Sequence, residues 1–295
     1  MTRVFNDPKN FAEEAVAGMA CAYPRYLMKV HGGVVSAAAA PAGQVAVIIG
    51  GGSGHYPAFA GWVGPGLADG AVCGNIFASP SASQAYSVSK AADNGGGILL
   101  AFGNYAGDRL HFGQAAEQLR AEGIDVRIVK VSDDVKSETI DKLRDRRGLC
   151  GDLVVFKIAG AAAARGKSLD EVEELAWRAN DWTKSYGVAF SGCTLPGADA
   201  PLFTVPEGQM SLALGVHGEP GIREVPMGTA AEIADELVDG VLAEAPALGE
   251  KGYNGKAIVL LNGLGTVKYE ELFVVWNRVA QRLEQAGITP VLPEV

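Results

Sequence analysis

The sequence lacks long hydrophobic runs and an excess of positive charge. No apolar stretch of the 295-residue chain approaches the roughly 18–20 residues that cross a membrane. Residues 1–8 lack the apolar core of a signal peptide. The net charge of −9 argues against nucleic acid or an anionic membrane surface as the main partner. We therefore expect a cytoplasmic protein with neither a membrane nor a nucleic acid as its partner.

Cysteine and histidine are scarce, with four residues of each. The cysteines are Cys21, Cys73, Cys150 and Cys193, and the histidines are His31, His55, His111 and His217. No two cysteines form a C-x-x-C pair, and no histidine follows them at zinc-finger spacing. The sequence therefore predicts no metal site, and we interpret the thiols as small buried side chains in a reducing compartment. Because histidines are so few, those flanked by glycine are candidates for chemistry, although His31 is interpreted as structural.

The most glycine-rich stretch, Gly50-Gly51-Gly52-Ser53-Gly54-His55, lacks both common nucleotide motifs. It has no Gly-Lys-Ser/Thr ending, and Pro57 stands where G-x-G-x-x-G needs its last glycine. The stretch follows a β-branched apolar run at 45–49, so it is expected to turn tightly and to expose backbone N–H groups. A small, oxygen-rich ligand fits such a loop better than a nucleotide does. The alternative is a glycine-rich connection with a chance histidine.

Apolar strands alternate with helical patterns along the chain. Strands are predicted at 45–49, 70–74, 97–102, 126–131, 153–158, 188–190, 210–216 and 256–261, and helices at 8–22, 82–93, 110–122, 168–185, 229–243 and 267–286. Residues 23–33 are expected to form a loop. This order predicts two α/β domains, 1–185 and 186–295, each a mixed sheet flanked by helices. Ligands of such sheets bind at the carboxyl ends of strands, where the loops at 50–55 and 103–108 lie.

Three polar segments flanked by glycine follow predicted strands and form the candidate site. They are Gly52-Ser53-Gly54-His55, Asn104-Tyr105-x-Gly107-Asp108 and His217-Gly218-Glu219-Pro220-Gly221. Two histidines and a carboxylate in one cleft suffice for nucleophilic and acid–base chemistry. Spacing along the chain does not establish that the three segments meet, so three unrelated loops remain the alternative.

At these positions the chain resembles the substrate-binding K subunit or domain of dihydroxyacetone (glycerone) kinases. The matching stretches, in order along nearly the whole chain, are GGGSGH at 50–55, G-x-IF-x-SP at 74–80, NYAGD at 104–108, VSDDV at 131–135, GVHGEPGI at 215–222 and VLLNGLGTVKYEEL at 259–272. As a set these motifs are highly specific. The resemblance implies a ketose-binding component of a kinase and a homodimer.

The resemblance also implies a role for each matching residue. His217 corresponds to a histidine that attacks the ketone carbonyl and forms a covalent hemiaminal. His55 corresponds to the acid–base histidine, and Asp108 to the carboxylate that helps to activate the substrate hydroxyl. The implied substrate-binding residues are Gly52, Ser53, Gly54, His55 and Asp108. The expected products are dihydroxyacetone phosphate or erythrulose phosphate.

No cofactor is expected on this chain. In the family, ATP or ADP with magnesium binds a separate helical L domain or subunit, so the chain is expected to be inactive without that partner. Family chains continue past the point where this one ends, so it is expected to be a piece of a longer kinase. A non-catalytic ketose-sensing regulator of the same fold is the alternative function, and a Rossmann-type oxidoreductase is a distant third.

Gly103 departs from the family pattern, in which a lysine often precedes the Asn-Tyr pair. Replacing a long cationic side chain by hydrogen is expected to leave space beside Asn104. With a roomier pocket, the protein is expected to handle a four-carbon ketose such as erythrulose at least as well as dihydroxyacetone.

Overall fold

The computed structural model describes residues 4–244, 253 and 255–295. They form two compact units, each of which is described by itself. The first unit runs to Ser132 and includes Arg147–Thr183 and Leu195–Asp199, and the second holds Asp133–Arg146, Lys184–Thr194 and the chain from Ala200 onward. The boundary between Thr183 and Lys184 lies close to the predicted division between 185 and 186. The chain also crosses from one unit to the other after residues 132, 146, 194 and 199.

The first unit is built on a six-stranded mixed sheet with the strand order β1-β2-β4-β3-β5-β6. The strands are β1 (Leu27–Val30), β2 (Gly33–Ser36), β3 (Ala46–Ser53), β4 (Gly70–Ile76), β5 (Ile98–Gly103) and β6 (Val126–Val131). The strands β4, β3, β5 and β6 run parallel, whereas β1 and β2 add an antiparallel edge. The strands predicted at 45–49, 70–74, 97–102 and 126–131 are confirmed.

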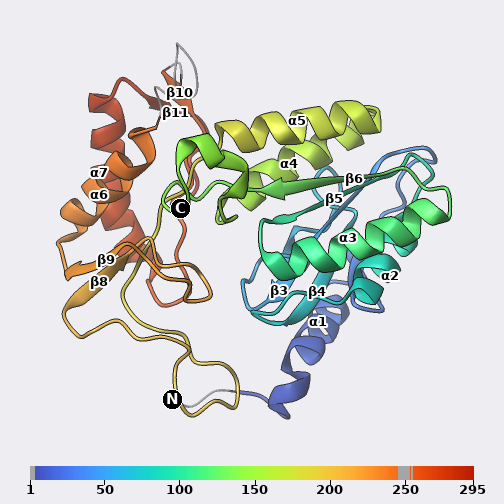
Figure 1. Ribbon diagram of the computed structural model, residues 1–295, viewed down its shortest axis with the longest axis horizontal. Coiled ribbons are helices and arrows are strands. Elements are labelled where there is room, and N and C mark those ends of the chain that lie inside the picture. Colours follow the sequence, from blue (N-terminus) through green and yellow to red (C-terminus); the bar gives the residue numbers. More distant parts are fainter. Residues whose placement is uncertain (1–3, 245–252, 254) are drawn as a thin grey trace. The chain divides into compact units, whose positions relative to one another are not determined.

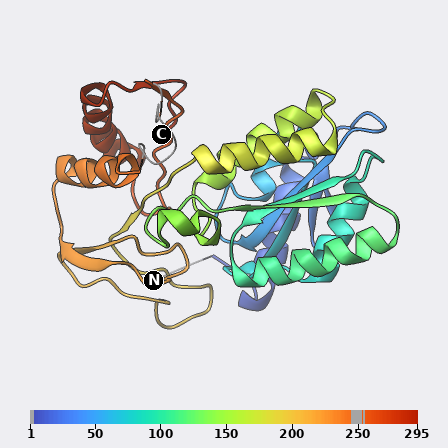
Figure 2. The ribbon, with the colours of Figure 1, turned by 45° about the horizontal axis from the view of Figure 1, so that its top comes forward.

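Helices cover both faces of this sheet (Figures 1 and 2). The helices are α1 (Phe11–Ala22), α2 (Ala82–Ala92), α3 (Ala106–Ala121), α4 (Gly151–Ala164) and α5 (Leu169–Trp182), with 3₁₀ turns at Pro8–Asn10 and Ala60–Trp62. Alternate residues of β3 enter different cores: Val47 and Ile49 pack with α4 and α5, and Ile48 packs with α2 and α3. Both faces of the central strands are therefore buried, which explains their continuous apolar sequences. The predicted fold class, α/β with a mixed sheet flanked by helices, is confirmed.

The strand predicted at 153–158 is wrong, because these residues lie inside helix α4. The helix is apolar on most sides, and Val155, Phe156 and Ala159 pack against the sheet. A short, fully buried apolar run does not distinguish a strand from a helix by its periodicity. The helix predicted at 168–185 is confirmed as α5, which opens with a capping box at Ser168 and ends at Trp182.

Two segments expected to be loops are regular structure. Residues 23–33 contain β1 and the start of β2, joined by a turn at His31 and Gly32. The edge strand β1 buries only Leu27 fully, so its sequence shows no strong apolar alternation. Helix α3 begins at Ala106 instead of 110. The sequence did not signal this start, because the N-cap residue Tyr105 makes no side-chain capping bond.

In the residues that the structure describes, the second unit contains two small sheets and two helices. Strands β7 (Val188–Ala189), β8 (Gln209–Leu212) and β9 (Arg223–Pro226) pair antiparallel, and β10 (Lys256–Ala257) pairs parallel with β11 (Thr289–Pro290). The helices are α6 (Ala230–Leu242) and α7 (Tyr269–Gln285), and a 3₁₀ segment spans Ile140–Asp145. The strands at 210–216 and 256–261 are shorter than predicted.

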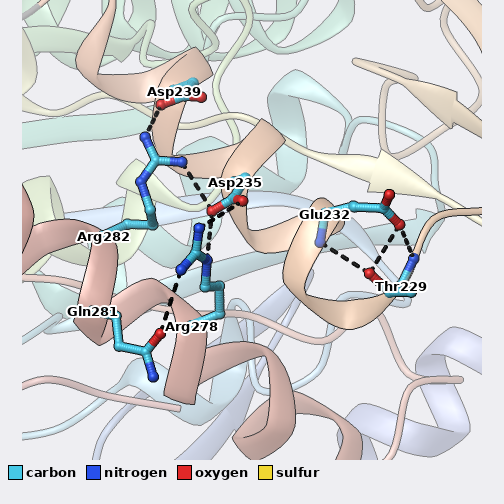
Figure 3. Close-up of polar contacts among 7 residues, drawn as sticks. All are labelled: Thr229, Glu232, Asp235, Asp239, Arg278, Gln281 and Arg282. Atoms are coloured by element: carbon cyan, nitrogen blue, oxygen red, sulfur yellow. Dashed lines mark hydrogen bonds and ion pairs between the residues drawn. The ribbon is translucent and has the colours of Figure 1, made fainter.

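Charged side chains join α6 to α7 across their buried apolar contact (Figure 3). Asp235 accepts hydrogen bonds from Arg278 Nε at 2.8 Å and Arg282 Nη1 at 2.9 Å. Arg282 also pairs with Asp239, one turn along α6. The hydrogen bonds from Arg278 and Arg282 lower the pKa of Asp235 to about 2. The carboxylate of Asp235 is therefore charged at neutral pH and pairs with both arginines of α7.

Gly240 on α6 gives a test of this packing. A Cβ atom there would lie 2.2 Å from Cδ1 of Tyr186, whose hydroxyl donates to Glu236 at 2.7 Å. We expect Gly240→Ala to lower the free energy of unfolding by about 1–3 kcal/mol, because overpacking displaces the ring. Urea unfolding measures the change. The control is Gly113→Ala on α3, where a Cβ meets nothing within 4 Å and about 0.5–1 kcal/mol of stabilisation is expected. Equal effects at the two sites would contradict the prediction.

Candidate functional site

The glycine-rich segment was also expected to be a loop that follows a strand, but its residues 50–53 continue β3 and pack main chain against main chain. A Cβ atom on Gly52 would lie 2.7 Å from the backbone N of Ala78 and 3.0 Å from the carbonyl carbon of Phe77. The pairing of β3 with β4 shifts register between Gly51 and Ser53, and Ser53 Oγ donates to the Gly74 carbonyl at 2.7 Å. Only a residue without a side chain allows this approach. The segment is therefore a closely packed part of the sheet and not an irregular connection.

His55 lies directly after this segment at the carboxyl end of the sheet. Its ring stacks on Phe77, with centroids 4.8 Å apart and planes inclined by 23°. The preceding Gly54 has φ +106°, and its absent Cβ leaves room for the same Phe77 ring. The Phe77 amide donates to the Ser53 carbonyl at 2.9 Å. Phe77 thus orients the imidazole, a role that its place in the G-x-IF-x-SP stretch could have signalled.

Asp108 lies in the first turn of α3 and is 6% exposed. A carboxylate is favourable there because the helix dipole is positive at its N-terminus. The adjacent Gly107 approaches the loop after β4: a Cβ atom on it would lie 2.6 Å from Ser79 Oγ. Strands β3 and β5 are parallel neighbours, so the segments that follow them emerge at one edge of the sheet. The structure therefore brings His55 and Asp108 to the same edge, within the first unit.

The space beside Gly103 is filled, so the expectation of an open pocket there is wrong. A Cβ atom on Gly103 would lie 3.2 Å from the Tyr105 ring and 3.5 Å from Oδ2 of Asp152. The Tyr105 hydroxyl donates to the Gly148 carbonyl at 2.8 Å and holds the ring in place. The Tyr105 side chain thus occupies the volume that Gly103 leaves. The identity of residue 103 alone could not indicate this packing.

His217 lies in the second unit, in the loop that follows β8. Its Nδ1 lies 2.9 Å from Oε1 of Glu219, and its backbone N–H donates to Oε2 of the same carboxylate at 3.1 Å. The loop is closed by hydrogen bonds from Gly215 N to Glu219 O and from Gly218 N to Gly215 O, both at 2.9 Å. Gly218 has φ +90°, and a Cβ atom on it would lie 2.5 Å from the ring of Phe203. The imidazole is therefore held by a tightly folded loop.

The carboxylate of Glu219 is charged at neutral pH. Burial by itself raises the pKa of Glu219, but the hydrogen bonds from His217 outweigh it and lower the pKa to about 2. Because the folded-state pKa is depressed, this stabilisation is present above the unfolded pKa of about 4.3 and is lost as the pH falls towards 2. An ionised carboxylate only accepts hydrogen bonds, so this contact is a hydrogen bond in the form of His217 that carries a proton on Nδ1. The sequence placed Glu219 in the motif but assigned it no role.

The three predicted catalytic residues are thus distributed over the two units. The first unit holds His55, Asp108 and the segment Gly52–Gly54, and the second holds His217. Among the described residues, no group of three or more histidine, cysteine, aspartate or glutamate side chains is arranged to hold a metal ion. No helix in the described ranges is long and apolar enough to cross a membrane.

The Dak1 domain model matches residues 17–295. The chain belongs to the Dak1 domain family. It is 63% identical over 295 residues to the L-erythrulose 1-kinase of Mycolicibacterium smegmatis, covering 100% of this chain and 52% of that protein. It is 40% identical over 293 residues to the dihydroxyacetone-binding subunit DhaK of the PTS-dependent dihydroxyacetone kinase 2 of Listeria innocua, covering 98% and 86%. The resemblance to dihydroxyacetone kinase K subunits is confirmed.

Solved structures of Dak1 relatives share the fold. The dihydroxyacetone kinase of C. freundii, in complex with AMP-PNP and Mg²⁺, superposes with a TM-score of 0.86 at 36% identity, over 97% of this chain and 53% of that one. The dihydroxyacetone kinase operon co-activator DhaQ superposes with a TM-score of 0.88 at 31% identity, over 96% and 86%. The chain spans about half the length of the erythrulose kinase that it matches.

Gly52 is the sharpest test of the packing around His55. We expect Gly52→Ala to lower the free energy of unfolding by about 1–3 kcal/mol, because the new methyl group meets main chain that cannot rotate away. The ring ¹H resonances of His55 should also shift as the stack on Phe77 changes. Urea unfolding and NMR measure these effects. The control is Gly18→Ala on α1, where a Cβ has no neighbour within 4 Å. Unchanged His55 resonances in Gly52→Ala would contradict the prediction.

Proposed function

We propose that this chain is the ketose-binding component of a dihydroxyacetone-type kinase. It binds a short ketose covalently through His217, as a hemiaminal, and presents a hydroxyl group of that ketose for phosphorylation. The observation that carries the proposal is the pair formed by His217 and the ionised Glu219, which prepares a ring nitrogen for attack on a carbonyl. Membership of the Dak1 family and the likeness to kinases of short ketoses support it.

A covalent link explains how the site would select its substrate. Neutral imidazole is a competent nucleophile near pH 7. Only a carbonyl compound forms the adduct, so glycerol, which has the terminal hydroxyl groups of dihydroxyacetone but an alcohol in place of the ketone, is rejected more sharply than hydrogen bonds alone allow. The adduct also holds the terminal hydroxyl in place, and phosphoryl transfer depends chiefly on such positioning.

In the first unit, we assign the acid–base work to His55 and Asp108. Asp108 accepts the proton of the hydroxyl group that is phosphorylated, and His55 exchanges a proton with the oxygen of the former carbonyl. The backbone of Gly52, Ser53 and Gly54 and the hydroxyl of Ser53 hold the substrate oxygens. The rigid backbone packing at Gly52 and the stacking of His55 on Phe77 support these assignments, because catalytic groups must be held in a fixed geometry.

The phosphoryl donor belongs to a partner in this proposal. The glycine-rich segment has neither nucleotide motif, and the related C. freundii kinase, whose structure contains AMP-PNP and Mg²⁺, is about twice as long as the matched region. An L domain or subunit would therefore hold ATP, or ADP, with magnesium. We further propose that the chain acts as a homodimer.

Erythrulose is our first choice of substrate and dihydroxyacetone the second. The support is the 63% identity to an L-erythrulose 1-kinase along the whole chain. Open space at Gly103 gives no support, since Tyr105 occupies it. The products would be erythrulose phosphate or dihydroxyacetone phosphate.

A non-catalytic ketose sensor is the second candidate, because the DhaQ co-activator has a closely similar fold. Phosphate transfer separates the two functions. The chain is mixed with an L subunit, a phosphoryl donor and either ketose, and the ketose phosphate is measured. Product formation supports the kinase, and adduct formation without any transfer supports the sensor.

His217→Ala is expected to abolish the covalent adduct, because the attacking nitrogen is lost. A ketose labelled with ¹³C at its carbonyl should show a new tetrahedral carbon signal when it binds the parent chain, and none with the variant. The matched control is His31→Ala, which removes an exposed histidine from the turn between β1 and β2. An adduct that survives in His217→Ala would overturn the assignment.

Asp108→Asn and His55→Ala are expected to slow phosphoryl transfer by about 10²–10⁴-fold, the usual contribution of a general acid or base. The adduct should weaken less than the rate falls, since neither residue forms the covalent bond. Rates come from the reconstituted enzyme and adduct equilibria from the labelled ketose. A variant whose rate stays within a few-fold of the parent's loses its proposed catalytic role.

A further inference from the structure

We infer that Glu219 is the positioning residue of the nucleophile: it fixes the tautomer of His217 and carries the counter-charge for the adduct. This inference rests on the proposed function. It assigns a role to a side chain that was only part of a motif in the sequence.

The geometry points to Glu219 because one carboxylate binds the same histidine twice. Oε1 lies 2.9 Å from the ring Nδ1, and Oε2 accepts the backbone N–H of His217 at 3.1 Å. The carbonyl of Glu219 also closes the loop by accepting from Gly215 N. The two side chains are only 23% and 29% exposed, so water screens their interaction little. The orientation of the imidazole is therefore fixed by contacts at its ring, its own backbone and the base of the loop.

The tautomer decides which nitrogen can attack. A neutral imidazole has one N–H and one nitrogen with a lone pair in the ring plane. Because the Glu219 carboxylate accepts the Nδ1 proton in a hydrogen bond, the lone pair is on Nε2. Without the carboxylate, the proton exchanges between both nitrogens, and only part of the population has a nucleophilic Nε2.

The same carboxylate would stabilise the adduct. The Nε2 lone pair forms the new N–C bond, the π electrons of the C=O bond move to its oxygen, and that oxygen takes up one proton that comes from the solvent. The ring keeps the Nδ1 proton and becomes positively charged. Its charge then lies against Glu219⁻, in the way that a buried aspartate supports the imidazolium of a serine protease triad. The addition therefore consumes one proton and leaves one positive charge on the ring.

The first experiment measures which ring nitrogen of His217 carries the proton, before any ketose is added. In the parent chain, ¹⁵N NMR of His217 should show Nδ1 protonated and Nε2 unprotonated near pH 7. In Glu219→Gln, which keeps the size of the side chain and removes its charge, the signals should move towards a mixture of tautomers. The matched control is Glu207→Gln, an exposed glutamate of the same unit. An unprotonated Nδ1 in the parent, or signals that Glu219→Gln leaves unchanged, would overturn the inference.

A second readout follows the adduct with ¹³C-labelled erythrulose. Glu219→Gln should weaken it by about 10- to 100-fold, as removal of a carboxylate partner does for metal-binding histidines. A merely structural role would instead alter folding, so the urea midpoint is measured on the same samples. Absence of an adduct in the parent would reject the proposed function, while the ¹⁵N signals would still decide whether Glu219 sets the tautomer. If Glu219→Gln does not fold, the ¹⁵N signals of the parent decide alone.

Discussion

The close approach of main chains at the carboxyl end of β3 is the constraint on which the site of the first unit depends. The backbone of Gly52 reaches the backbone at Phe77 and Ala78 at distances that exclude any Cβ atom. This contact places the Phe77 ring where His55 stacks on it. Asp108 then comes to the same edge because β5 is the parallel neighbour of β3. Steric exclusion at Gly52 and the parallel pairing of β3 with β5 thus determine where His55 and Asp108 lie.

In the second unit, a charged partner holds the His217 side chain in addition to close packing. Glu219 is ionised at neutral pH because its hydrogen bonds to His217 outweigh the cost of burial. Gly218 allows the tight loop, and Phe203 packs where its side chain would be. The candidate residues of the two units are therefore held by different means: His217 by a charged partner within its own loop, and His55 by stacking on Phe77.

Local signals predicted much of the fold, and failed where burial hides periodicity. The capping boxes at Ser168 and Thr229 mark helix starts because their side chains bond the first free N–H groups. The apolar run at 153–158 did not reveal helix α4, because a helix buried on most sides has no amphipathic stripe. The edge strand β1 was missed for the opposite reason, since it buries too little to show an alternating pattern.

The sequence by itself determined the family, the parallel strands and the candidate residues, since each depends on short contiguous motifs. His55, Asp108 and His217 all stand in such motifs. Only the tertiary structure decided what surrounds them. It showed that Tyr105 fills the space beside Gly103 and that Glu219 binds the ring of its neighbour. Side-chain direction and the volume that is left between elements depend on packing from distant parts of the chain, which no local pattern records.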